Sequence, residues 1–180
     1  MATRLFTYGS PKMVIIQNQW LAGQFATAWG VNVNAVGIKA TALAIEYGEL
    51  VKLTETGMAG NSFYTVERVA SETTKFGVIL RTTDGQIGLE EGFIERPRGN
   101  NMSIYPLAGA NFFMVAVPII ASQSVTIGAV PYACIVSGSE GALQAGSANF
   151  GIALTGWAFA SLPYAPTKGA GLCALITKTV

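Results

Sequence analysis

The 180-residue chain contains no histidine. Histidine is the usual general base for serine and cysteine nucleophiles and a common ligand of transition metals, so its absence leaves triad-type hydrolysis and most transition-metal sites without their usual residues. The one acidic cluster, Glu90, Glu91 and Glu95, lies beside Arg96 and Arg98. Paired carboxylates can hydrolyse a glycosidic bond, but we favour a solvated turn whose charges pair locally. The sequence therefore predicts no catalytic residue, no metal site and no cofactor.

Charged residues are almost absent from the second half of the chain. Residues 1–98 hold nine Lys or Arg and nine Asp or Glu, whereas residues 99–180 hold only Glu140, Lys168 and Lys178. Soluble domains normally keep charged side chains on their surface, because Lys, Glu, Arg and Asp are seldom buried without a partner. The imbalance predicts that other subunits cover much of the exterior of this half, as in a component of an assembly.

The chain also has no long apolar run and no basic stripe. A helix needs about 20 mostly apolar residues to cross a bilayer, and the longest run, residues 112–121, is interrupted by Pro118. Residues 1–11 have no apolar stretch typical of a secretory signal, so we expect folding in the cytoplasm of the cell that makes the protein. The formal net charge is +1. Neither a membrane nor a nucleic acid is therefore an expected partner.

There are only two cysteines, Cys134 and Cys173. They lack the paired spacing of a zinc or redox motif. We favour two small buried thiols, and a disulfide between them stays open as an alternative that has no secretory context to support it.

Short β-branched or aromatic runs separated by Gly, Pro, Asn and Ser dominate from residue 41 onward. This pattern is typical of many strands and few helices. The length fits one compact domain, in which we expect an extended N-terminal arm at residues 1–40 and a β-barrel domain at residues 41–180. The expected strands are residues 49–54, 62–70, 76–82, 101–105, 111–118, 124–127, 131–137, 150–160 and 171–179.

The apolar pattern differs between the early and the late strands. In residues 76–82 one register is apolar and the other is mixed, which predicts one face in the core. In residues 150–160 and 171–179 both registers are apolar, so both faces need cover. Two-sided burial arises inside a sandwich of two sheets, or where one sheet packs on a neighbouring molecule. The sequence is compatible with either.

Two further groups of residues are candidates for contact with a partner. The arm places Trp20, Phe25 and Trp29 among Gln, Asn, Gly and Ala, with no amphipathic helical spacing. Because large aromatics dominate interface hot spots, they can dock on a partner; equally, they can cap the open end of the chain's own barrel. Arg96 and Arg98 precede a Gly-Asn-Asn stretch, and they suit either bidentate pairing with carboxylates on a neighbour or a solvated loop without a partner.

Several segments of glycine and apolar residues follow one another along the chain. They are Leu21-Ala22-Gly23-Gln24 in the arm, then residues 45–51, 76–80, 105–117, Ile127-Gly128, residues 132–136 and residues 154–157 before a last Gly-then-apolar strand. In their order and spacing the chain resembles the structural cement or decoration proteins that bind the outside of tailed bacteriophage capsids. The resemblance covers most of the chain. It implies an all-β barrel or jelly-roll-like sandwich with an extended N-terminal arm, no catalysis, and self-association on a capsid lattice.

These observations predict a virion structural protein that binds the outer surface of the capsid and stabilises the shell by bridging major capsid protein subunits. The expected partners are the major capsid protein and the chain itself, as a dimer or trimer. The alternatives are a phage tail or baseplate β-domain, and a β-sandwich carbohydrate-binding module that stacks sugars on Trp20, Trp29 or Trp157. The residues expected at an interface are Trp20, Gln24, Phe25, Trp29, Arg96, Arg98 and Trp157.

Overall fold

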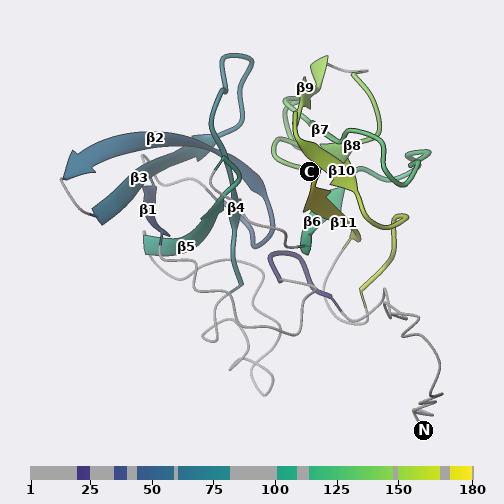
Figure 1. The fold of residues 1–180 in the computed structure, drawn as a ribbon, viewed down its shortest axis with the longest axis horizontal. Coiled ribbons are helices and arrows are strands. Elements are labelled where there is room, and N and C mark those ends of the chain that lie inside the picture. The colour runs from purple at the N-terminus through teal and green to yellow at the C-terminus, as the bar shows by residue number, and fades with distance from the viewer. Residues whose placement is uncertain are drawn as a thin grey trace, which may run out of the picture.

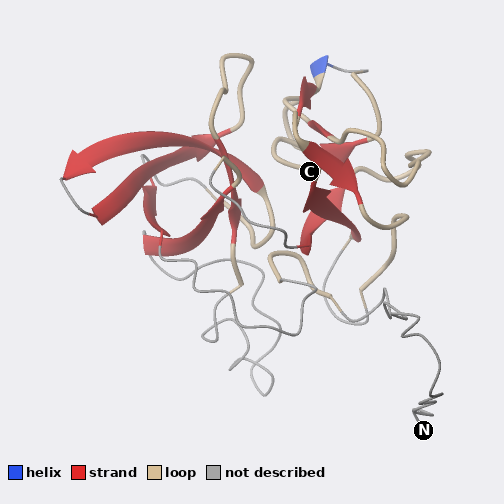
Figure 2. Cartoon of the chain, in the orientation of Figure 1, coloured by secondary structure: helices blue, strands red, loops and turns tan. Residues whose placement is uncertain are grey.

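Strands and loops make up nearly all of the described chain, in which no α-helix occurs and 3-10 geometry is found only at Phe150. The all-β fold class is therefore confirmed, and Figure 2 shows the strands gathered into two groups. The computed structural model describes residues 20–24, 35–39, 44–58, 61–81, 101–108, 114–147, 150–166 and 171–179.

The first group of strands forms a closed barrel, which lies on the left of Figure 1. Its strands are β1 (Ala35–Lys39), β2 (Leu50–Met58), β3 (Asn61–Arg68), β4 (Phe76–Ile79) and β5 (Asn101–Pro106), in the order β1-β3-β2-β4-β5. β1 closes the barrel because it pairs in parallel with β3 and antiparallel with β5. This strand comes from the range 1–40, which was expected to form the arm.

The barrel interior is packed with apolar side chains that alternate along its strands. Its buried cluster contains Ile45, Tyr47, Val51, Leu53, Val66, Ile79, Met102 and Ile104. Gly77 makes close packing possible here, because a Cβ at this position would lie 2.7 Å from Ile104 Cγ2 and 2.8 Å from Leu53 Cδ1. The mixed register of residues 76–82 thus faces the barrel core, so this strand is covered on both faces and not on one.

The second group of strands forms a six-stranded sheet, on the right of Figure 1. Its strands are β6 (Met114–Ile119), β7 (Tyr132–Ala133), β8 (Leu143–Gln144), β9 (Ile152–Ala153), β10 (Trp157–Phe159) and β11 (Leu172–Lys178), in the order β10-β11-β6-β8-β7-β9. The longest pairing is antiparallel and joins β6 to β11, from Leu172 opposite Ile119 to Thr177 opposite Met114. These two strands form the centre of the sheet.

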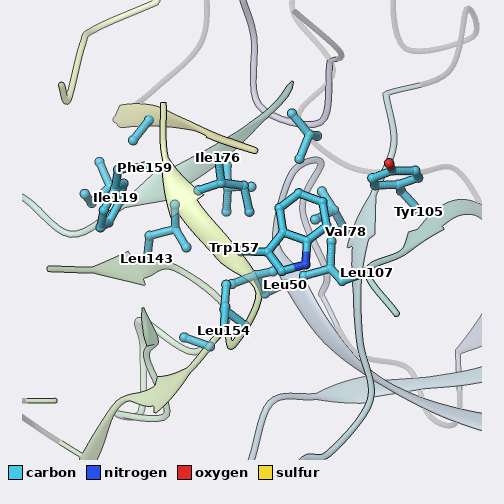
Figure 3. Packing of buried hydrophobic residues seen from close by; sticks show 14 of the residues in the cluster. Leu50, Val78, Tyr105, Leu107, Ile119, Leu143, Leu154, Trp157, Phe159 and Ile176 are labelled. Atoms are coloured by element: carbon cyan, nitrogen blue, oxygen red, sulfur yellow. The ribbon is translucent and has the colours of Figure 1, made fainter. Parts of the chain in front are cut away.

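The largest core lies between the barrel and the second sheet. Residues of one register of β6 and β11 contribute to it, together with barrel residues that point away from the barrel interior. Figure 3 shows Trp157 between Leu50, Val78 and Leu107 of the barrel part and Leu154, which lies in the turn between β9 and β10. Trp157 and Tyr105 meet edge to face, with ring centroids 6.3 Å apart. The barrel therefore covers one face of the second sheet.

The opposite face of the second sheet is covered by the chain's own loops. Ala116, Cys173 and Leu175, from the other register of β6 and β11, form a buried cluster with Tyr164. Trp20 and Ala22 pack against this cluster. The two-sided burial expected for residues 171–179 is confirmed, and within the described residues both covers come from the same chain.

Three of the expected strands differ from the observed ones. Residues 131–137 form a strand only at Tyr132–Ala133. Residues 150–160 form two short strands, β9 and β10, because a turn brings the Trp157 amide to the Leu154 carbonyl at 3.0 Å. The turn changes the register, so Leu154, Trp157 and Phe159 all enter the same core. Residues 124–127 form no strand.

Candidate interaction surface

Charged side chains on the barrel pair with one another across its outer face. Lys52 Nζ lies 3.2 Å from carboxylate oxygens of both Glu67 and Glu72, and Lys75 Nζ lies 3.1 Å from Glu55 Oε1. Most of these groups are well exposed, so the pairs are screened by water and contribute little stability. Their effect is to keep this face of the barrel hydrated.

The second sheet and its loops have a different surface. We use the term second-sheet region for residues 114–147, 150–166 and 171–179, in which Glu140 and Lys178 are the only charged residues. The large hydrophobic side chains found exposed among the described residues all lie in this region. They are Ile127 (58% exposed), Val130 (41%), Val136 (42%), Phe150 (82%) and Leu162 (50%). Single exposed apolar residues are common on protein surfaces, whereas apolar residues that are grouped together mark interaction sites, so the grouping of these five residues matters.

Three of the exposed residues belong to the outer edge of β10. The Gly128 amide donates to the Phe159 carbonyl at 2.8 Å, and the Phe159 amide donates to the Ala129 carbonyl at 2.9 Å. The segment of residues 128–129 thus occupies the backbone groups of Phe159 that point outward from the sheet. Ile127 and Val130 flank this segment, and Leu162 follows β10; we call these three residues the edge group. A partner would meet their side chains and not an open strand edge.

The other two exposed residues belong to the end of the β7–β9 pair. Ala133 pairs with Ile152 in an antiparallel register, so the chain that leaves β7 runs toward Val136 beside the chain that enters β9 from Phe150. We call Val136 and Phe150 the tip group. Phe150 has a backbone φ of 60°, in the left-handed region that bulky residues rarely adopt.

A cluster of charged residues joins the barrel to the second-sheet region. Arg68 Nη1 lies 3.2 Å from Glu140 Oε2, and Arg68 Nη2 donates to the Ala44 carbonyl at 2.9 Å. The carboxylate of Glu49 accepts a hydrogen bond from the Glu46 amide at 3.1 Å. Burial raises the pKa of Glu49 from its usual 4.5 to about 7, although the Glu46 amide and the Arg68 charge act in the opposite direction. This junction therefore changes its charge near neutral pH.

Trp20 and Gln24, two of the residues expected at an interface, are held against their own chain. The Tyr164 hydroxyl donates to the Trp20 carbonyl at 3.0 Å, and burial raises the pKa of Tyr164, which keeps this donor protonated. The Gly23 amide donates to the Ala116 carbonyl at 2.8 Å, and the Ala116 amide donates to the Gln24 carbonyl at 2.9 Å. The side chains of Trp20 and Gln24 are half-buried. Their contact with a partner stays a prediction.

From the sequence, Trp157 was expected at an interface. In the structure it does not lie at the surface of the chain. Its side chain is 4% exposed and lies in the core between the barrel and the second sheet. It therefore offers almost no surface to a partner subunit or to a sugar ring. The other expected interface residues, Phe25, Trp29, Arg96 and Arg98, lie outside the described residues, as does the acidic cluster next to the arginines.

The described part of the chain offers little for other kinds of site. No group of three or more Cys, Asp or Glu within it could hold a metal ion. Cys134 and Cys173 are both buried and are not joined in a disulfide, as favoured from the sequence. No helix in these ranges has the length and the apolar content to traverse a bilayer.

The edge and tip groups are not recognisable from apolar runs alone. The sequence pattern places Phe150 in a strand with two apolar faces, and Ile127 at the end of another strand. A Gly follows each of them, Gly128 and Gly151, but Gly77 also follows Phe76 inside β4. The local sequence therefore contains no signal that separates these exposed residues from strand residues.

One solved structure shares the fold over almost the full chain. The protein is similar to a chain in "The capsid of Myoviridae Phage XM1", with a TM-score of 0.61 and 18% sequence identity. The similarity covers 92% of this chain and 95% of that chain. No protein-family model matches the sequence, and no curated protein does. The shared property is the fold.

Proposed function

We propose that this chain is a virion structural protein that binds the outer surface of a bacteriophage capsid and stabilises the shell by bridging major capsid protein subunits. The observation that carries the proposal is the fold similarity, because it extends over nearly the whole length of both chains and the other chain belongs to a phage capsid structure. The role is structural, without catalysis, and its location is the virion.

The surface of the second-sheet region supports this proposal. Its exposed apolar side chains lie in a part of the chain where Glu140 and Lys178 are the only charged residues described, and Glu140 is already paired with Arg68. A partner that covers this surface removes apolar area from water, and it desolvates few charges. Binding can therefore be favourable without charged residues on the partner.

Stabilisation of the shell would follow from repetition. A standard protein interface buries about 1,600 Å² in total, and its affinity depends on a few well-packed anchors more than on area. A subunit that contacts two capsid proteins at once holds them together, because separating them exposes the apolar surface again. On a symmetric lattice the same contacts recur at each equivalent position, so weak contacts add through avidity.

The direct test uses the purified protein and expanded empty capsids of the phage that encodes it. We expect the protein to sediment with the capsids and to raise the temperature at which the shells disrupt. Because the proposed surface is nearly uncharged, the affinity should change little between low and high salt. A failure to bind, or binding that leaves the disruption temperature unchanged, would contradict the proposed function.

The charged face of the barrel provides a matched control. Replacing both members of the Lys75–Glu55 pair with alanine removes one exposed ion pair and leaves the second-sheet region intact. This double variant should bind capsids as the wild type does. Its failure to bind would place the capsid contact on the barrel.

A further inference from the structure

Phe150 combines two unfavourable properties. Its aromatic side chain is 82% exposed to water, although burial of such a side chain is strongly favourable. Its backbone has a φ of 60°, a conformation in which asparagine and glycine are common and phenylalanine is rare. Neither property contributes to folding. Strained residues of this kind persist where the surrounding structure fixes them and where the position has a use.

The backbone that follows Phe150 is closely packed. The next residue, Gly151, packs so closely on the side chain of Gln144 that a Cβ at position 151 would collide with Gln144 Nε2, and it would lie 3.0 Å from Tyr132 Cβ. Gln144 is only 2% exposed, and its Nε2 donates to the Gly146 carbonyl at 2.9 Å. The backbone beside Phe150 thus rests on a buried, hydrogen-bonded amide.

A residue whose neighbouring backbone is already fixed makes a better anchor than one on a mobile loop. Ordering a free side chain or loop at an interface costs free energy, and this cost is avoided when the free protein already holds the bound conformation. Phe150 is also accompanied by Val136, which is 42% exposed, and no charged residue occurs between residues 141 and 167. The tip group is therefore an exposed, uncharged and apolar feature.

We propose that Phe150 is an anchor residue that inserts its ring into an uncharged, apolar recess on a capsid subunit. This inference rests on the proposed function and adds the residue that makes the contact and the chemistry of the site that receives it. The recess must be apolar, because a charged or polar lining would lose its water without gaining a hydrogen bond from the ring.

The occupant of the contact follows from the proposed function. The fold is shared with a chain of a phage capsid structure, so we assign the recess that receives the ring to a capsid subunit. In a contact between two copies of this chain, Phe150 could also meet a different residue of the same patch, so self-association is an outcome of the test.

Phe150→Asn separates a binding role from a structural one. Asparagine adopts a positive φ readily, so this variant removes the ring and relieves the backbone. We expect capsid affinity to fall at least about tenfold, as for an interface hot spot, while the thermal midpoint of the free protein stays the same or rises. Phe150→Tyr keeps the ring and should bind within about threefold of the wild type.

Ile127→Asn, in the edge group, is the matched control for loss of an exposed apolar side chain. It should weaken capsid binding less than Phe150→Asn does.

The measurements are co-sedimentation with capsids, thermal unfolding, and sedimentation velocity of the free protein. If the wild type binds capsids and Phe150→Asn binds equally well, the inference is wrong and the proposed function stands. If Phe150→Asn instead dissociates an oligomer without weakening capsid binding, the ring lies between copies and the inference is again wrong. If the wild type itself does not bind, the proposed function fails and the anchor has no partner. A lower thermal midpoint with unchanged affinity would show a structural role.

Discussion

The barrel and the second-sheet region differ in where their apolar and charged side chains lie. The barrel keeps its apolar side chains inside and pairs charged residues such as Lys52 and Glu67 on its outer face. The central strands of the second sheet, β6 and β11, have apolar side chains on both faces. The sheet lies between the barrel on one side and Tyr164 and Trp20 on the other, so its central strands need few charges.

This difference between the two regions changes the meaning of the missing charges. From the sequence alone, a nearly uncharged half indicates cover by other subunits. The structure shows that much of that apolar surface is covered within the chain, and that the large apolar side chains left exposed in the described residues are confined to the edge and tip groups. The deficit of charge is therefore mainly a property of a buried sheet, and among the described residues only its loops expose large apolar side chains.

The strongest test of this division is Trp157→Ala. Trp157 lies between the two regions and contacts Tyr105, whose burial raises the pKa of its hydroxyl to about 12. Removing a buried tryptophan leaves a cavity and costs about 3–5 kcal/mol. We expect this decrease in the free energy of unfolding to be measured in urea. Both regions should unfold in one transition, because they share a core. A loss below about 1 kcal/mol, or unchanged stability with reduced capsid binding, would mean that Trp157 acts at an interface.

Substitutions at two glycines of one loop test how tightly the second-sheet region packs against the barrel. Gly138 and Gly141 have nearly the same φ, 85° and 80°, but a Cβ at Gly141 would collide with the Leu50 carbonyl, whereas a Cβ at Gly138 would meet nothing within 4 Å. Gly138→Ala should cost about 1 kcal/mol for the backbone alone. Gly141→Ala should cost about 3 kcal/mol, because the collision adds to the strain.

These two variants are compared by urea unfolding under the same conditions. Equal losses would indicate that the loop moves away from Leu50 without cost and that the contact between the two regions is loose. In that case the hydrogen bond from the Leu50 amide to the Gly141 carbonyl, 2.9 Å long, would add little to the junction.

Much of the fold follows from the sequence because it depends on local patterns. The strands around Val51, Val66 and Ile104 are observed at nearly their expected places, since alternating apolar residues bounded by turn residues predict strands well. The expected strand at residues 150–160 is wrong because its apolar residues come from two strands joined by a turn, and the register changes between them. A run of apolar letters does not show where the chain turns.

The candidate site was less predictable, because exposure depends on tertiary packing. Trp157 has the composition of an interface anchor but is buried between two layers, whereas Phe150 has the composition of a core residue but is exposed. Which of two aromatic residues faces water is decided by contacts with segments distant in the sequence, such as β4 and β5 beside Trp157. Sequence periodicity contains no information about those contacts.

The charged junction predicts a dependence of stability on pH. The pKa of Glu49 is raised to about 7 in the folded protein, so the folded state binds a proton more tightly than the unfolded state. The contribution of protonated Glu49 to the free energy of unfolding is fully present below about pH 4.5 and is lost as the pH rises through 7. This contribution is on the order of 2 kcal/mol, because water reaches part of the carboxyl group. The groups that face Glu49 are Glu46, Arg68 and Glu140.

Glu49→Gln replaces the carboxyl group with a neutral one of similar shape. We expect the urea midpoint of this variant to change much less between pH 5 and 8 than that of the wild type, which falls over the same range. Glu55→Gln, on the exposed barrel face, is the matched control and should keep the wild-type dependence. If Glu49→Gln and the wild type show the same pH profile, another group is responsible.

The smallest effect is expected on the outer face of the barrel. Lys75 and Glu55 form an ion pair whose side chains are 52% and 60% exposed, so removing it with Lys75→Ala should change the free energy of unfolding by no more than about 0.5 kcal/mol. Adding salt should reduce even this difference, because salt screens exposed pairs. A loss of about 2 kcal/mol or more, on the order of a buried contact, would show that the barrel face is not simply hydrated surface. The contrast drawn between a charged, water-facing barrel and an apolar, internally covered sheet would then fail.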